Sequence, residues 1–477
     1  MARGRLAATA LIDLLGDWRG DATAYEALAE RVRLLVIDGR ISTDVRLPSE
    51  RELSERLALS RTTITAAYRL LRETGYARSV QGSGTTTTMP LLTSELNRRH
   101  PALVNLAMAT LPATGLMPEA VAAASQALPA HYATPGYHLV GTTELREALA
   151  RRFTARGLPT EPDEILVTTG GQSAIALLAR SLVTRGDRVY AESPSYPHAY
   201  DALRDAGARI VTSPVDTETG WDIAALTTTI ARTAPTLAYV MPDFHNPTGR
   251  SMTLEDRHAL LEAAARVDAV VIADETTADL DIDSPDRHGP LGSLAADHRA
   301  RVVHVGSAGK LMWGGLRVGW IRASREILSR VAGLRPASDL GTPVWEQLVA
   351  AHLLPRADEI IEERRAQLLE RRGALYQSVK QHLPDWDLPS QIHGGLAAWA
   401  KLPAPVSSQL TLAARAAGLE ITAGPRFGTD GAYERYIRLP LTPEPTALTQ
   451  AIELLGTLWP TVAQRPGLGV TLSDRMV

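Results

Sequence analysis

The sequence contains no cysteine among its 477 residues. Disulfide bonds and metal sites built from cysteine thiolates are therefore excluded, and the composition is consistent with a reducing compartment. Lysine is nearly absent as well, since only Lys310, Lys380 and Lys401 occur among the 50 basic residues. In a chain so biased towards arginine, Lys310 raises the question of why its position needs an amine, because an arginine would have kept the charge.

A long apolar run is also lacking. The longest uncharged stretch, residues 100–118, contains three prolines and a glycine, so it does not suit a membrane helix. Asp13 interrupts a brief apolar run near the N-terminus and no cleavage-site pattern follows, so we expect no secretory signal peptide. The formal net charge of −3 does not by itself indicate a polyanionic partner. We expect a cytoplasmic protein with no membrane partner and no metal site.

The length of the chain predicts two or three domains, and its first ninety residues differ from the rest. Apolar residues at helical spacing predict a helix over residues 25–38. Ser49 followed by Glu52 is a capping-box pattern at the start of a second helix. Ser60 is suited to cap a third helix over residues 61–74.

The segment that follows predicts a β-hairpin over residues 76–88, turned at residues 81–84. Three helices and a hairpin of this kind form a winged helix-turn-helix, which we place at residues 1–88. Residues 89–104 are expected to be a linker. Beyond them, apolar β-rich runs such as "EILVTT", "AVVIAD" and "RVVHVG" alternate with helical patterns, which predicts an α/β domain with a large, mostly parallel sheet.

The placement of arginines in the N-terminal region, more than its charge, favours DNA binding. Residues 1–90 carry 13 arginines against 11 acidic residues, a net charge of only +2. Arg51 and Arg61 flank two predicted helix starts, where a guanidinium can reach a phosphate or a guanine edge. Ser60, Thr62 and Thr63 offer hydroxyls and free amides to phosphates. A lone arginine is more often part of a solvated face, so none of these positions decides the matter alone.

The segment "LPSERELSERLALSRTTITAAYRLLRETGYARSVQGSGT" resembles the DNA-binding domain of the GntR family over its whole length. The resemblance implies that Arg51 and Arg61 contact double-stranded operator DNA. It also implies that the wing at Gln81 and Gly82 approaches the minor groove. Thr65 stands where some relatives carry an arginine, which is a departure from the family pattern.

Lys310 lies in a glycine-rich segment directly after the apolar run "RVVHVG". A lysine amine can lose its proton and condense with an aldehyde, whereas a guanidinium stays protonated. Ser307 precedes it by three residues and Arg317 follows it by seven. A hydroxyl, an imine-forming amine and a fixed cation together suit an aldehyde cofactor that carries a phosphate. Taken alone, a lysine in a glycine-rich loop is more often a surface residue.

Four further motifs fit such a cofactor, although each alone is consistent with ordinary turns and packing. The run "LVTTGGQSAIALLARSL" predicts free amides at the start of a helix, a phosphate site. An aromatic in a proline-bounded loop can stack on a ring, and an amide in a rigid turn can donate to a ring hydroxyl. A carboxylate that ends an apolar strand needs a partner such as a protonated pyridine nitrogen. The residues in these four motifs are Gly171, Gln172 and Ser173, then Tyr196, Asn246 and Asp274.

Together and in this order, the motifs resemble those of fold-type I pyridoxal-phosphate aminotransferases, from about residue 106 to about residue 455. The resemblance implies pyridoxal 5'-phosphate as the cofactor, held as a Schiff base on Lys310. It implies an effector domain at residues 105–477, with a large domain over about 143–335 and a small domain from about 105–142 and 336–477.

The same resemblance assigns a role to each motif. Asp274 would pair with the pyridine nitrogen, Asn246 would bond the ring hydroxyl, and Tyr196 would stack on the ring. Arg438, in "YIRLPL", would grip an effector carboxylate through a bidentate pair. Tyr137 matches a tyrosine that reaches the phosphate of a neighbouring subunit. The phosphate ligands within the chain would be Gly171, Gln172, Ser173, Ser307 and Arg317.

One position departs from the aminotransferase pattern. Family members usually carry a tyrosine two or three residues after the aspartate, where this chain has Thr276 and Thr277. A threonine is too short to reach the place of the phenol. We therefore expect cofactor binding to survive and transamination to be doubtful, with at most a half-reaction.

A GntR-type domain followed by an aminotransferase-like domain is the arrangement of the MocR subfamily of GntR regulators, which this chain resembles over nearly its full length. The resemblance implies a head-to-tail homodimer in which each DNA-binding domain lies against the partner's large domain. It implies that pyridoxal phosphate, or its aldimine with an amino acid, alters DNA binding. Vitamin B6 supply and amino acid metabolism are both open as the regulated process. The alternatives are a working aminotransferase with a DNA-binding appendage, or a dimer scaffold with a degenerate pocket.

Overall fold

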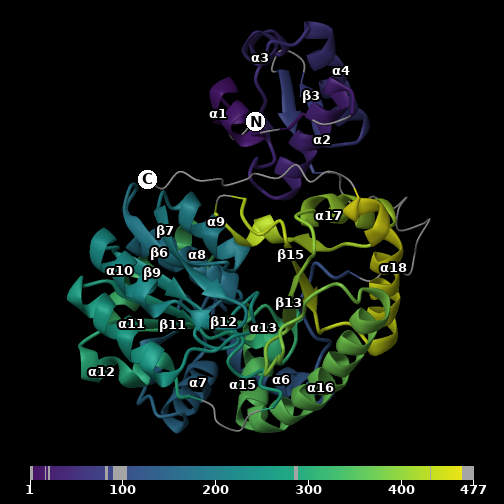
Figure 1. The fold of residues 1–477 in the computed structure, drawn as a ribbon. Helices are drawn as coiled ribbons and strands as arrows, with labels where there is room; N and C mark the ends of the chain where they lie inside the picture. The colour runs from purple at the N-terminus through teal and green to yellow at the C-terminus, as the bar shows by residue number, and fades with distance from the viewer. Residues whose placement is uncertain are drawn as a thin grey trace.

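The structure is a computed structural model that describes residues 4–16, 18–19, 22–80, 84–89, 105–283, 288–429 and 431–464. A smaller N-terminal unit, purple in Figure 1, stands on a larger body that contains the rest of the described chain. Gln81 and Gly82, expected at the wing, lie outside the described residues. Within these ranges, none of the helices has the length and apolar character needed to cross a membrane.

The N-terminal unit is a winged helix-turn-helix, as the sequence predicts. Ser49 Oγ accepts the amide of Glu52 at 3.2 Å, and Ser60 Oγ accepts the amide of Thr63 at 3.1 Å, so both predicted N-caps form. The other half of the expected capping box does not form, because the Glu52 carboxylate pairs with Arg5 instead. The helices are α1 (Ala8–Leu15), α2 (Ala24–Ile37), α3 (Glu50–Leu57) and α4 (Arg61–Glu73). The sheet has the order β1-β2-β4-β3, with β1 (Gly4–Arg5), β2 (Val45–Arg46), β3 (Ala77–Val80) and β4 (Gly84–Thr87).

The larger body contains the predicted mostly parallel sheet, with eight strands in the order β5-β12-β11-β10-β9-β6-β7-β8. β6, β7, β9, β10 and β11 run parallel to their neighbours in this series, whereas β12 and β8 are antiparallel to theirs. The strands are β5 (Ile165–Thr168), β6 (Arg188–Ser193), β7 (Arg209–Asp216), β8 (Gly220–Trp221), β9 (Leu237–Val240), β10 (Val270–Asp274), β11 (Arg301–Ser307) and β12 (Gly319–Arg322).

Helices cover both faces of this sheet, which explains why its central strands are apolar throughout. One buried cluster joins the sheet to α8 (Gly171–Leu182), α9 (Pro197–Asp205) and α14 (Arg325–Leu334). A second cluster joins the other face to α10 (Ile223–Thr233) and α11 (Leu254–Arg266), near the short α12 (Ala295–His298).

A smaller α+β part completes the body around an antiparallel sheet of order β13-β15-β14. Its strands are β13 (Ala397–Lys401), β14 (Thr422–Ala423) and β15 (Tyr436–Pro440). One continuous buried cluster runs through this part and its flanking helices. These helices are α6 (Met117–Ala127), α7 (Thr143–Ala155), α15 (Val344–Leu353), α16 (Ala357–His382), α17 (Ser407–Ala416) and α18 (Pro445–Ala463). The carboxyl ends of β10 and β11 face this part, and the site forms there, as is usual for open α/β sheets.

The turn between β5 and α8 is held against β12 so closely that a side chain would not fit. A Cβ on Gly319 would lie 2.4 Å from the carbonyl carbon of Gly170. We expect Gly319→Ala to lower the free energy of unfolding by about 1–3 kcal/mol or more, because backbone must shift to admit the methyl group. Urea denaturation measures the free energy of unfolding of the variant. Gly333→Ala is the matched control, since a Cβ there meets nothing within 4 Å and a helical alanine is neutral or slightly stabilising. Equal losses in the two variants would contradict the steric argument.

Candidate cofactor pocket and DNA-binding face

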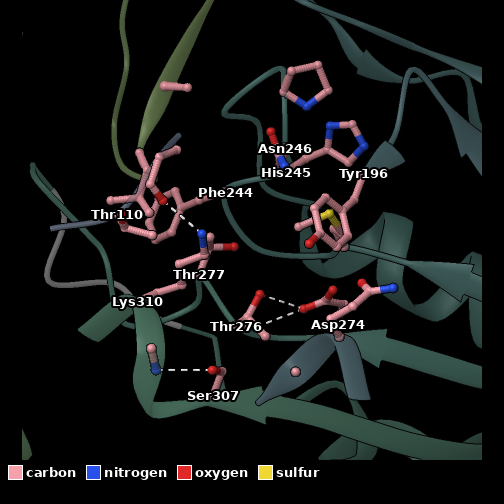
Figure 2. Close-up of a pocket in the computed structure, with 18 of the residues that line it drawn as sticks. Thr110, Tyr196, Phe244, His245, Asn246, Asp274, Thr276, Thr277, Ser307 and Lys310 are labelled. Atoms are coloured by element: carbon pink, nitrogen blue, oxygen red, sulfur yellow. Dashed lines mark hydrogen bonds between the residues drawn. The ribbon is translucent and has the colours of Figure 1, made fainter. Parts of the chain in front are cut away.

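A cavity of about 170 Å³ lies between the carboxyl ends of the large sheet and the small sheet. Figure 2 shows side chains from several segments pointing into it. The structure brings together most of the residues that the sequence singled out. The lining includes Gly171, Gln172, Tyr196, Asn246, Asp274, Ser307, Lys310, Arg317 and Arg438.

Lys310 lies on α13 (Ala308–Leu311), a single turn that follows β11 directly. Its Nζ donates to the carbonyl of Ala109 at 2.8 Å. Burial, assisted by the cations of Arg438 and Arg317, lowers the pKa of Lys310 to about 8, although Asp274 opposes the shift. A lysine with this pKa has a substantial neutral fraction near neutral pH, and the neutral amine is the form that attacks an aldehyde.

Asp274 is the last residue of β10 and is almost fully buried. Its carboxylate accepts the hydroxyl of Tyr239 at 2.6 Å, the hydroxyl of Thr276 at 2.7 Å and the amide of Thr276 at 3.1 Å. Burial raises the pKa of Asp274, and these hydrogen bonds oppose that rise because they favour the charged form. A buried carboxylate held in this way fits a cationic partner such as a protonated pyridine nitrogen.

The two threonines that replace the usual tyrosine are both engaged. Thr276 donates its hydroxyl to Asp274, and Thr277 donates its hydroxyl to the carbonyl of Asp243 at 2.9 Å. Neither hydroxyl is therefore free to take the place of the missing phenol. A different phenol, that of Tyr239 on β9, donates a hydrogen bond to the carboxylate of Asp274. Sequence reasoning missed Tyr239, for which the signal was a single hydroxyl in the otherwise apolar strand "LAYV".

The opposite end of the pocket is suited to a phosphate. The helix α8 begins at Gly171 without a side-chain cap, so its first amides are available to an anion. Ser307 and Arg317 also line this end. Arg317 lies over the turn and donates to the carbonyl of Thr169 at 3.1 Å, and a Cβ on Gly170 would come within 2.6 Å of its Nη2. Free amides, a hydroxyl and an arginine match the expected phosphate ligands.

Arg438 lies on β15 and is 7% exposed. Its Nη2 donates to the carbonyl of Ala107, and its guanidinium lies 5.3 Å from the ring of Phe427. Nε has no hydrogen-bond partner among the described residues. Burial lowers the pKa of Arg438 to about 10. A buried guanidinium with a vacant donor fits the carboxylate that the sequence predicts for it.

The remaining wall of the pocket is largely aromatic and apolar. Tyr196 caps α9, and burial, together with the charge of Asp274, raises its pKa to about 12, so the phenol stays neutral. Asn246 precedes Pro247 through a cis peptide bond. Phe244 and Thr110, which sequence reasoning did not identify, also face the cavity (Figure 2). Phe244 lies two residues before Asn246 in the turn that the sequence singled out, whereas the segment of Thr110 gave no motif, and only the fold shows that both face the cavity.

Two predicted ligands do not line the cavity formed by the described residues. Ser173 follows Gly171 and Gln172 in the first turn of α8. Tyr137 lies in an irregular segment and is 70% exposed. Its expected contact with a neighbouring subunit stays a prediction.

The predicted DNA contacts lie at the starts of α3 and α4. Arg51 and Arg61 are both exposed, and Arg51 has only a loose ion pair with Glu55, at 3.9 Å. Ser60 Oγ lies 2.7 Å from the hydroxyls of both Thr62 and Thr63, so these side chains form one polar cluster at the start of α4. Thr65, one turn further along, donates to Glu50 of α3. An exposed helix start with accessible cations is suited to phosphates and base edges.

Comparison with known proteins agrees with both parts of the structure. Residues 103–455 match the family described as aminotransferase class I and II, and residues 24–86 match the bacterial regulatory proteins of the gntR family. The chain is 31% identical to the probable rhizopine catabolism regulatory protein MocR of Rhizobium meliloti, over 78% of this chain and 80% of that protein. It is 27% identical to the uncharacterized HTH-type transcriptional regulator YdcR of Escherichia coli, over 87% and 94% of the two chains.

Among solved structures, LysN, the alpha-aminoadipate aminotransferase of Thermus thermophilus in complex with N-(5'-phosphopyridoxyl)-L-leucine, matches with a TM-score of 0.69. It is 28% identical and covers 78% of this chain and 95% of that one. The chain therefore belongs to the aminotransferase class I and II family, with a GntR-family DNA-binding domain in front of the fold-type I domain. In this combination it is a DNA-binding transcriptional regulator of the MocR type, and its cofactor is pyridoxal phosphate.

Tyr239 gives a direct test of the support for Asp274. We expect Tyr239→Phe to weaken pyridoxal phosphate binding by about 10- to 100-fold, because a buried carboxylate loses a hydrogen bond and its pKa rises further. Titration of the cofactor, followed by absorbance, measures the affinity.

The control is Tyr190→Phe, which removes a buried hydroxyl from β6 that bonds Ser213. Tyr190 is outside the residues that line the pocket. If both variants bound the cofactor as tightly as the unmodified protein, Tyr239 would have no role in the site.

The pKa of Lys310 gives a second test. We expect the rate at which Lys310 condenses with pyridoxal phosphate to rise with pH and to level off above about 8, because only the neutral amine reacts. Stopped-flow absorbance measures the rate. A rate that kept rising towards the ordinary pKa of lysine would show that the pocket does not perturb this amine.

Proposed function

We propose that this regulator uses its pocket as a sensor of pyridoxal phosphate, alone or together with an amino compound that carries a carboxylate, and that occupancy changes how it binds DNA. The observation that carries the proposal is the convergence of Lys310, Asp274 and Arg317 on one cavity, in a chain whose other domain presents a DNA-binding face. A scaffold with a degenerate pocket offers no reason for this convergence.

Bound pyridoxal phosphate supplies an aldehyde that condenses with amines and a ring that accepts electrons. The residues of the chain would hold it in place. Asp274 would hold the ring nitrogen, Arg317 and the start of α8 the phosphate, and Lys310 the aldehyde carbon. Arg438 would bind the carboxylate of the amino compound through its vacant donor. This division of tasks favours α-amino acids as co-effectors, and vitamin B6 supply stays open as the regulated process.

The proposal includes a division of the chain at residues 1–88, 89–104 and 105–477, and a cytoplasmic head-to-tail homodimer that binds an operator. Exposed large apolar side chains at Met108, Tyr132 and Tyr137 support dimerisation of the larger body. Each helix-turn-helix would then read one half of a symmetric site.

Binding of the protein to DNA upstream of its own gene tests the sensing role. We expect pyridoxal phosphate to change the affinity, and Lys310→Ala to abolish that response without abolishing DNA binding. Fluorescence anisotropy at fixed salt measures both, because salt alone alters protein–DNA affinity. Lys380→Ala, at an exposed lysine near the end of α16, is the matched control. Unchanged affinity with the cofactor alone would shift the test to amino acids, and a failure of both would contradict sensing.

A turnover assay tests the competing enzymatic function. With an amino donor and a keto-acid acceptor, we expect at most one half-reaction, because the hydroxyls of Thr276 and Thr277 are already engaged. Product formation measured over many cofactor equivalents decides between the two functions. Sustained turnover at rates typical of enzymes would make the protein an aminotransferase that also binds DNA.

A further inference from the structure

A buried glutamate lies behind the wall of the pocket that carries Asn246. Glu192 is on β6, and its side chain is completely buried. It is outside the set of residues that line the cavity. A carboxylate taken out of water is costly unless its oxygens are paired, so the partners of Glu192 indicate which segments it holds together.

Three donors surround the carboxylate of Glu192. Oε1 accepts the indole N–H of Trp221 at 2.7 Å, and Oε2 accepts the backbone amide of Met241 at 2.9 Å. Nε2 of His245, which is equally buried, lies 3.4 Å from Oε2. Indole and backbone nitrogens only donate, so both oxygens of Glu192 act as acceptors. The carboxylate therefore joins the end of β6 to β8, to the residue that follows β9 and to the turn that contains His245.

The imidazole of His245 has a partner at each nitrogen. Nδ1 lies 2.9 Å from the hydroxyl oxygen of Thr248, and Nε2 faces Glu192. At 3.4 Å the contact with Glu192 is longer than an ordinary hydrogen bond, so the attraction is mainly electrostatic. It favours a proton on Nε2, and the hydroxyl of Thr248 can then donate to Nδ1. The indole of Trp221 packs edge-on against the same ring, with centroids 5.6 Å apart, which further fixes the ring in place.

His245 and Asn246 are neighbours in the turn that follows β9, and both line the cavity (Figure 2). The amide of His245 donates to the carbonyl of Arg250 at 2.7 Å, and the amide of Gly249 donates to the carbonyl of His245 at 2.6 Å. The backbone of His245 thus closes the turn, while its side chain ties the turn to β6. The position of Asn246, one residue further on, therefore depends on how His245 is held.

This dependence bears on the ring hydroxyl of the cofactor. Asn246 is the residue expected to donate to that hydroxyl, and the tyrosine that usually assists it is replaced by Thr276 or Thr277. The hydroxyls of both threonines are engaged elsewhere. With one donor fewer, recognition of the ring hydroxyl depends more strongly on how accurately the amide of Asn246 is placed.

We propose that Glu192 and His245 are positioning residues that hold the amide of Asn246 against the ring hydroxyl of pyridoxal phosphate. The inference rests on the cofactor and on the predicted role of Asn246. It applies whether or not occupancy of the pocket changes DNA binding, so its test is independent of the sensing test.

An analogue of the cofactor isolates this single contact. Pyridoxal phosphate with hydrogen in place of the ring hydroxyl keeps the aldehyde, the phosphate and the pyridine nitrogen. Absorbance titrations of the full chain give a dissociation constant for each ligand, and the ratio of the two constants measures the preference for the hydroxyl. A general loss of packing weakens both ligands alike and leaves the ratio unchanged. Asn246→Ala defines the preference that remains without the amide.

We expect Asn246→Ala to lower the preference for the hydroxyl by about tenfold, the effect of one lost hydrogen bond to a polar or charged group. His245→Leu removes both contacts of the ring and should lower the preference nearly as far. Glu192→Gln removes the charge that attracts the imidazole and should lower it by about threefold or more. Since the two residues act through one contact, the variant that combines both changes should match His245→Leu alone.

Three further variants separate positioning from general damage to the fold. His245→Gln can still present an N–H to Glu192, so it should restore most of the preference. Thr248→Val loosens the ring only at Nδ1 and should lower the preference less than His245→Leu does. Tyr190→Phe, two residues before Glu192 on the same strand, removes a buried hydrogen bond to Ser213 and should leave the preference unchanged. Circular dichroism of each variant without cofactor establishes that it is folded.

Two results would overturn the inference. In the first, folded His245→Leu, Thr248→Val and Glu192→Gln keep the preference of the unmodified chain, so the pair does not position Asn246. In the second, the unmodified chain and Asn246→Ala show the same preference, so the amide does not reach the ring hydroxyl. Failure of the unmodified chain to bind either ligand would contradict the cofactor itself, and the inference with it.

Discussion

Burial of the Lys310 amine is the constraint on which the rest of the site depends. A buried cation is costly, so the pocket must either lower its pKa or supply acceptors. This chain does both, because Arg438 and Arg317 disfavour the charge while the carbonyl of Ala109 and the carboxylate of Asp274 offset the cost. The amine has all these partners only where the ends of β10 and β11 meet the segment around Ala109. The fold holds these three segments together.

A buried arginine of the smaller part holds in place the segments that meet at Lys310. Arg364 of α16 donates to the carbonyls of Leu311 at 2.7 Å, and of Met312 and Pro112 at 2.8 Å each. The turn that carries Lys310 and the segment that carries Ala109 are thus tied to the same helix of the smaller part. A guanidinium suits this task because its donors lie in one plane and bind several carbonyls at once. The position of the amine is therefore set by a residue that does not line the pocket.

Much of the fold and many of the pocket residues could be predicted from the sequence, for a physical reason. Parallel strands bring their carboxyl ends to one edge, so Asp274 after one apolar strand and Lys310 after the next were bound to lie close together. Tyr239, Phe244 and the carbonyl of Ala109 could not be predicted in this way. Their roles depend on which side chain or carbonyl faces across a gap between segments remote in sequence, and no periodicity records that.

The segment that begins the effector domain competes with the ligands of the pocket. Its carbonyls at Ala107 and Ala109 accept the donors of Arg438 and Lys310, the two groups that would bind a carboxylate and an aldehyde. A ligand that engages both groups would have to replace both bonds, which would release this segment from its present position. The segment follows the predicted linker, so it is the part of the pocket that lies nearest in sequence to the DNA-binding domain. A ligand need only bind the two positions with different affinity for such a protein to work as a switch.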